Sequence, residues 1–110
     1  MQSEEITASG RRFSVVRNGV ELGHAYVYLL HNDLHVESFA LLEDVHVHPD
    51  YQGQGIGNEL VRAVIEYVAS VAVYKLIATS RDDGTRAHVH AWYERLGFAK
   101  YGTEFRMNFV

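Results

Sequence analysis

The run VHVHPDYQGQGIG, residues 45–57, decides how the chain folds. It opens with alternating valines, reaches Pro49, and then carries glycine at three alternate positions, Gly53, Gly55 and Gly57. Proline cannot donate to a strand ladder, and glycine lets the backbone adopt positive φ and approach an anion closely. Apolar residues at helical spacing follow the loop: Leu60, Val61, Val64, Ile65 and Val68. The run therefore predicts a strand end, a glycine loop and a helix.

Upstream of this run, the sequence predicts three antiparallel strands. Phe13–Arg17 is short and β-prone, and the Asn18-Gly19 pair that follows it is the strongest short hairpin signal. Val20–His31 and Val36–His48 are long and rich in apolar and β-branched residues, with turn-forming residues between them.

Downstream, the sequence predicts a short strand, a second helix and a closing hairpin. Lys75–Thr79 has the composition of a buried strand. Four apolar residues mark an amphipathic helix, with Thr85 as N-cap and Gly97 as its end: Val89, Trp92, Tyr93 and Leu96. Phe98–Tyr101 and Thr103–Phe109 form the hairpin. The order βββαβαββ predicts an α/β (α+β) fold with a mixed, mainly antiparallel sheet in one domain, residues 1–110.

Composition excludes several classes of protein. No apolar run approaches the roughly 18 residues of a membrane span, and the chain has no cysteine for disulfides or nucleophilic catalysis. A net charge of −4 without a Lys/Arg cluster argues against nucleic acid as a partner. The start of the chain lacks the features of a secretory signal, which predicts a cytoplasmic location. The acidic surface suits a cationic acceptor.

The three glycines predict a cradle for a diphosphate, since backbone N–H groups and the start of a helix would point at it. Taken alone, the glycines fit a plain tight turn equally well. A Walker loop is excluded because Asn58 and Glu59 follow Gly57 in place of Lys and Ser/Thr. A dinucleotide fold is excluded because three antiparallel strands precede the loop.

Residues 45–57 resemble the coenzyme A motif of the GNAT superfamily, V-x-V-x-P followed by [Q/R]-x-x-G-x-G. The run WYERLGF, residues 92–98, resembles the second signature of that family, F-Y-x-[K/R]-x-G-F. The two motifs occur in the family's order and spacing, and the resemblance covers about residues 12–110. Leu42–Val45 and Tyr74–Leu76 also resemble the glucosamine-phosphate N-acetyltransferase branch.

The resemblance implies acetyl-coenzyme A as cosubstrate. It implies that the backbone of Val45 and Val47 pairs with the pantetheine arm and that the N–H groups of residues 52–57 hold the pyrophosphate. The expected cofactor-binding residues are Val45, His46, Val47, Gln52, Gly53, Gln54, Gly55, Ile56, Gly57, Arg86 and Tyr93. Two of them depart from the family pattern, because many members carry Arg at the position of Gln52 and Asn at that of Arg86.

Acetyl transfer to an amine needs a base, a stabilised oxyanion and a proton for the thiolate. Glu43 and Asp44 end the strand that leads into the loop, and one of them is the expected base. Regular alternation would point them to opposite faces, so the residues alone do not choose between them. By resemblance, Tyr93 is the general acid and the N–H of Val45 polarises the thioester carbonyl.

The histidine pairs His46/His48 and His88/His90 do not predict a metal site. Positions i and i+2 diverge on a helix, and neither pair comes with the further ligands of a closed zinc site. No metal is expected.

The leading hypothesis is an enzyme that moves acetyl from acetyl-coenzyme A to a primary amine of a small molecule by direct attack in a ternary complex. The alternatives are a protein lysine or N-terminal acetyltransferase, and a module that binds acyl-coenzyme A without turnover. The chain lacks room for the two helices that the family usually places after its first strand. We therefore expect an open acceptor side and a homodimer formed through the last strand near Phe105 and Phe109, with a monomer as the alternative.

Overall fold

The computed structural model describes all 110 residues. They form two compact units, the sheet unit of residues 1–78 and the C-terminal unit of residues 79–110, and each is described by itself.

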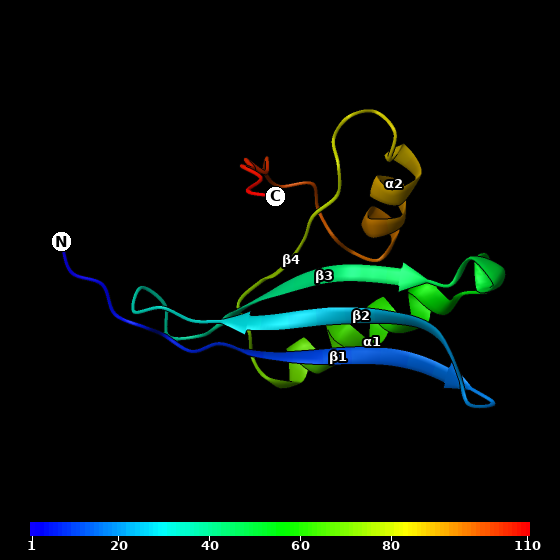
Figure 1. Cartoon of the computed structure of the whole chain (residues 1–110), viewed down its shortest axis with the longest axis horizontal. Helices are drawn as coiled ribbons and strands as arrows, with labels where there is room; N and C mark the ends of the chain where they lie inside the picture. The colour runs from blue at the N-terminus through cyan, green and yellow to red at the C-terminus, as the bar shows by residue number, and fades with distance from the viewer. The chain divides into compact units, whose positions relative to one another are not determined.

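The sheet unit contains four strands in the order β1-β2-β3-β4 (Figure 1). Their bounds are β1 Ser9–Arg17, β2 Val20–Leu30, β3 Phe39–Val47 and β4 Leu76–Ala78. The first three pair in antiparallel fashion, as predicted, and β4 pairs parallel to β3. Asn18 and Gly19 join β1 directly to β2, with φ of 52° and 76°. Positive φ at both residues is the two-residue hairpin turn that the sequence indicates.

Helix α1 (Ile56–Ser70) covers one face of β1–β3 (Figure 1). The core between helix and sheet is wholly apolar, and its largest fully buried side chains are Ile56, Leu60, Val27, Val61 and Val64. The rings of Phe13 and Tyr67 pack 5.7 Å apart between β1 and α1. We call the other face of the sheet the open face, because no helix of the sheet unit covers it.

Two strands begin three or more residues away from their predicted starts, and β4 begins one residue after its predicted start, at Leu76. β1 starts at Ser9, four residues before Phe13, because the paired strand β2 is long enough to extend the ladder to Leu29. β3 starts at Phe39 and not at Val36. The Val36 side chain is 92% exposed, so this residue has no core contact that would draw it into the sheet.

The C-terminal unit contains helix α2 (Ala87–Arg95). Gly97 has a φ of 107°, which confirms the predicted helix end. The predicted N-cap was wrong: Arg86 occupies that position. The hydroxyl and N–H of Thr85 both donate to the Asp83 carboxylate, at 2.5 and 3.0 Å, so Thr85 serves the preceding turn. Neither helix has the length and apolar character of a transmembrane span.

The predicted closing hairpin was also wrong. Residues 98–110 contain no strand, so the observed order is βββαβα. The alternating apolar side chains of this segment are almost fully exposed: Phe105 93%, Met107 77% and Phe109 87%. A two-stranded hairpin is marginal unless one face packs on something, and these side chains have no such face in their unit.

Candidate functional site

One edge of β3 is unpaired where the glycine loop begins. β3 pairs with β2 as far as Val47, but its pairing with β4 ends at Leu42, opposite Ala78. Glu43–Val47 therefore have a strand on one side only within the sheet unit. A free strand edge presents N–H and C=O groups to which an extended ligand can add as a further strand. The Val47 carbonyl accepts a hydrogen bond from Gln52 Nε2 at 3.3 Å.

A β-bulge lies in the middle of this free edge. His24 pairs with His46 and Tyr26 pairs with Glu43, so three steps along β3 match two along β2. Two residues of β3, Asp44 and Val45, therefore lie opposite a single residue of β2. Asp44 has a φ of 51°. Bulges re-aim side chains and are common beside functional sites. The bulge removes the simple alternation of Glu43 and Asp44: Glu43 is partly buried, whereas Asp44 is exposed.

The glycine loop leads from this edge to the start of α1. After a single 3-10 turn, η1 (Pro49–Tyr51), Gly53 and Gly55 have φ of 79° and 82°. A Cβ placed on either glycine would meet no atom within 4 Å, so open space lies in front of the loop. Gly55 is the N-cap of α1 and no side chain caps the helix. An uncapped first turn, with its positive dipole end, attracts anions.

Gly23 on β2 sets how closely α1 approaches the sheet. A Cβ on Gly23 would lie 2.8 Å from the His46 carbonyl oxygen, 3.1 Å from Ile56 and 3.2 Å from Leu60. Only glycine therefore allows the first turn of α1 to pack beside the end of β3. Sequence analysis missed this residue, although a lone glycine inside a strand does signal a close backbone approach.

An ion pair with Arg17 neutralises the negative charge of Glu59 near the start of α1. Glu59 lies in the first turn of the helix, where its carboxylate would repel a bound anion. Arg17 Nη2 donates to Glu59 Oε2 at 2.7 Å, and both side chains are about half exposed.

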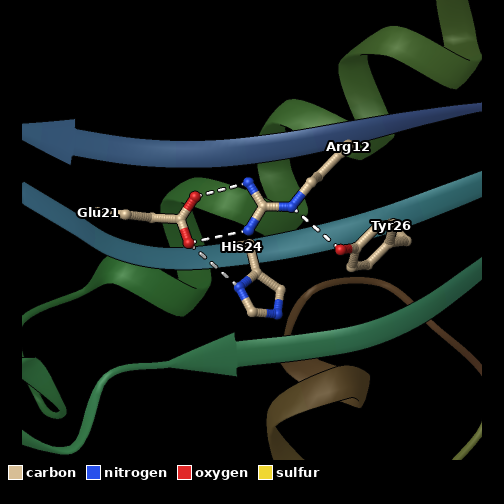
Figure 2. Close-up of polar contacts among 4 residues, drawn as sticks. All are labelled: Arg12, Glu21, His24 and Tyr26. Atoms are coloured by element: carbon tan, nitrogen blue, oxygen red, sulfur yellow. Dashed lines mark hydrogen bonds and ion pairs between the residues drawn. The ribbon is translucent and has the colours of Figure 1, made fainter.

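A polar network occupies the open face beside the bulge (Figure 2). Arg12 donates through Nη1 and Nη2 to the two oxygens of Glu21, at 2.6 and 2.8 Å, and through Nε to the Tyr26 hydroxyl at 3.1 Å. His24 Nδ1 lies 3.5 Å from Glu21 Oε2. The hydrogen bonds from Arg12, supported by His24, lower the pKa of Glu21 to about 2.

Sequence analysis missed this network. The Asn18-Gly19 turn alone would place Arg12 opposite Ala25, and it is the register shift between Val15 and Val16 that brings Arg12 opposite Tyr26. Next to the network lies a hollow of about 170 Å³ lined by Glu21, Leu22, Gly23, His24, His46 and His48.

The sheet unit brings together the predicted residues from Glu43 to Gly57, and the remaining two lie in the C-terminal unit. Arg86 is the N-cap of α2. The Tyr93 ring on α2 packs 4.9 Å from Trp92 and, edge to face, 5.3 Å from Phe98. No group of three potential ligands is placed to hold a metal ion.

Comparisons with known proteins agree on one family. The model of the acetyltransferase (GNAT) family matches residues 2–98. A glucosamine 6-phosphate N-acetyltransferase of Trypanosoma brucei brucei is 33% identical over 67 residues, which are 61% of this chain and 42% of that protein. The protein of the same name from Schizosaccharomyces pombe is 32% identical over 65 residues, 59% of this chain and 54% of that one. The chain thus spans about half the length of these curated relatives.

A solved structure supports the fold. The crystal structure of a Trypanosoma brucei acetyltransferase superposes with a TM-score of 0.76 at 25% identity, over 92% of this chain and 68% of that one.

Proposed function

The chain belongs to the acetyltransferase (GNAT) family, and from that premise we propose that it transfers acetyl from acetyl-coenzyme A to a primary amine of a small molecule. The amine attacks directly in a ternary complex. The observation that carries the proposal is the continuity of the free β3 edge, the glycine loop and the uncapped start of α1. Together they offer strand-like pairing to an extended arm and N–H groups to a diphosphate at its end.

The residues of the free edge and the loop fit coenzyme A. Val45 and Val47 have backbone groups available for the pantetheine amides, although Gln52 now bonds the Val47 carbonyl and would have to release it or share it. The open space at Gly53 and Gly55 leaves room for the pyrophosphate, where a Cβ would intrude. His46 and the backbone N–H groups of Gln54, Ile56 and Gly57 complete the proposed site, and Arg86 is assigned to a phosphate. Bound there, acetyl-coenzyme A supplies an activated thioester.

The catalytic roles divide among three kinds of group. The N–H of Val45, at the bulge, is proposed to polarise the thioester carbonyl. The Tyr93 hydroxyl is proposed to give a proton to the thiolate. A carboxylate of the bulge, Glu43 or Asp44, attracts the acceptor's ammonium and takes its proton directly or through water.

Glu43→Gln and Asp44→Asn, each measured across pH, separate the two carboxylates. Loss of the working carboxylate should lower turnover at neutral pH and be partly rescued where the amine is already neutral, above about pH 9. The variant of the other residue should follow the wild-type profile. If both variants follow it, the bulge carboxylates have no such role.

Amino sugars are the acceptors we favour, because both curated relatives are named for glucosamine 6-phosphate. A protein lysine or N-terminal amine is the second candidate, since a site for acetyl-coenzyme A at the glycine loop would serve such an acceptor equally well. A third reading is acyl-coenzyme A binding without turnover.

Two measurements test the proposed function. Acetyl-coenzyme A at about 100 times its dissociation constant should stabilise the protein by about 2.7 kcal/mol, seen as a rise in Tm. Thiol release should then be followed with glucosamine 6-phosphate, spermidine, an aminoglycoside and a lysine peptide. No rise in Tm would refute the donor site. A rise without turnover on any amine would favour the binding module.

We also propose a homodimer in which the C-terminal segment pairs with a second chain and helps to wall the acceptor site. The exposure of Phe105, Met107 and Phe109 supports it, because their alternation suits a strand with one apolar face. Light scattering should give twice the mass of one chain. The mass of a single chain, with turnover intact, would favour a monomer that takes a macromolecular acceptor.

A further inference from the structure

Glu21 and His24 have the geometry of a carboxylate–imidazole dyad. Arg12 donates hydrogen bonds to both oxygens of Glu21 and to the Tyr26 hydroxyl (Figure 2). These bonds fix the position of the Glu21 carboxylate. Glu21 Oε2 in turn lies 3.5 Å from His24 Nδ1. The His24 side chain is only 24% exposed, and its ring packs 5.7 Å from Tyr26 and 5.4 Å from His46.

This geometry determines which ring nitrogen can accept a proton. The pKa of Glu21 is lowered to about 2 by Arg12, so the carboxylate is ionised at neutral pH and can only accept hydrogen bonds. An ionised Glu21 therefore favours the neutral His24 tautomer that carries its proton on Nδ1, 3.5 Å from Glu21 Oε2. Nε2, on the other side of the ring, keeps its lone pair, and His24 lines the hollow next to the network.

The dyad stands next to the bulge. His24 pairs with His46, the residue directly after Val45, and the ladder step from His24 to Tyr26 spans the bulge itself. The charged and titratable groups around His24 are Arg12 from β1, Glu21 and Tyr26 from β2, and Glu43, His46 and His48 from β3 and the residue after it.

We infer that His24, oriented by Glu21, accepts through Nε2 the proton that the acceptor amine loses during acetyl transfer. The inference rests on the proposed function and replaces one part of it: the bulge carboxylate still attracts the ammonium, but His24 takes the proton in place of that carboxylate. Imidazole suits this task because its protonation changes between about pH 5 and 8, whereas an ordinary carboxylate is a weak base there.

The proton balance is complete. The ammonium gives one proton to His24 Nε2, and the neutral nitrogen forms the N–C bond as the C–S bond breaks. The amine nitrogen loses a second proton as the amide forms, and the coenzyme A thiolate gains one proton to become the thiol. The products are an amide, a thiol and one proton, which His24 passes to solvent. Arg12 and Glu21 act through His24 and are positioning residues.

The first test needs no substrate. Long-range ¹⁵N–¹H spectra of the wild type at neutral pH should show His24 as the Nδ1–H tautomer. Glu21→Gln should weaken that preference, because a neutral amide holds the Nδ1 proton less strongly. A wild-type His24 with its proton on Nε2 would overturn the inference, whatever the protein turns over.

The second test measures turnover with the amine that proves best in the panel. His24→Asn keeps an amide N–H near the position of Nδ1 and removes Nε2. Its kcat should fall about 10²-fold at neutral pH, with acetyl-coenzyme A affinity unchanged and with recovery at high pH. His31→Asn, in the exposed turn after β2, is the control and should follow the wild type.

The outcomes separate the two claims. A wild type that turns over while His24→Asn keeps its kcat and pH profile overturns the His24 assignment alone. A wild type that binds acetyl-coenzyme A but acetylates no amine overturns the proposed catalysis, and the His24 role with it. His24→Gln, with its own Tm measured, replaces the Asn variant if that variant does not fold.

Discussion

Gly23→Ala should destabilise the protein and weaken the glycine loop's site. The added Cβ would lie 2.8 Å from the His46 carbonyl oxygen, a backbone atom of the β2–β3 ladder that cannot move without disturbing its strand. It would also press on Ile56 and Leu60 at 3.1 and 3.2 Å. Both belong to the first turns of α1 and are buried, so the strain passes to the start of the helix.

The expected magnitude follows from two opposing effects. Overpacking a filled core costs about 1–3 kcal/mol. Alanine in a strand interior is about 0.5–1 kcal/mol better than glycine, which offsets part of that cost. The free energy of unfolding should therefore fall by about 1–2 kcal/mol, and Tm by about 5–15 °C for a small domain. The rise in Tm with acetyl-coenzyme A should shrink as well.

Circular dichroism with heat or urea measures the loss, and Gly10→Ala is the matched control. A Cβ on Gly10 would meet the Tyr28 ring at 3.0 Å and the Val27 carbonyl oxygen at 3.3 Å. However, the ring can turn aside, and the backbone contact is longer than the 2.8 Å one at Gly23. Gly10→Ala should therefore cost much less than Gly23→Ala. Equal Tm values for the two variants, or a Gly23→Ala variant as stable as the wild type, would refute the packing role of Gly23.

Three further predictions concern the glycine loop, the proposed general acid Tyr93 and the Arg12–Glu21 pair. Gly55→Val places a β-branched residue at φ 82° and should cost about 1–2 kcal/mol and abolish the acetyl-coenzyme A shift. Gly19→Val, at φ 76°, is the control: it should cost a similar amount but keep the rise in Tm with acetyl-coenzyme A, which is measured by fluorimetry. If Gly55→Val and Gly19→Val both kept this rise, the glycine loop would be a plain turn. Tyr93→Phe should keep binding and lower kcat by up to about 10²–10⁴-fold in thiol-release assays, and an unchanged kcat would leave Tyr93 as a packing residue. Because its pairing with Arg12 lowers the pKa of Glu21 from 4.5 to about 2, the wild type's Tm advantage over Glu21→Gln should be present above pH 4.5 and vanish as the pH falls through about 2. An advantage that stays constant from pH 2 to 7 would contradict that pairing.

Local signals predicted the elements that depend on near neighbours. The Asn18-Gly19 turn needs positive φ at both residues, which few other pairs supply, and it formed where the sequence indicates. The strand end, glycine loop and apolar stripe of α1 also follow from neighbouring residues. The same reasoning failed at residues 98–110, because an alternating pattern produces a strand only where another strand is available to pair with it.

The sequence by itself thus determined the element order through α2, the glycine loop and the family, since propensity, periodicity and motif spacing are properties of short segments. Tertiary structure decided where the β4 ladder stops, that Asp44 and Val45 share a bulge, and that Gly23 lies against the start of α1. It also placed His24 beside Glu21 and His46. Apart from the Glu21–His24 contact, which lies within β2, these features are pairings between strands or between strand and helix. A one-residue change of register would alter each of them while leaving every local propensity the same.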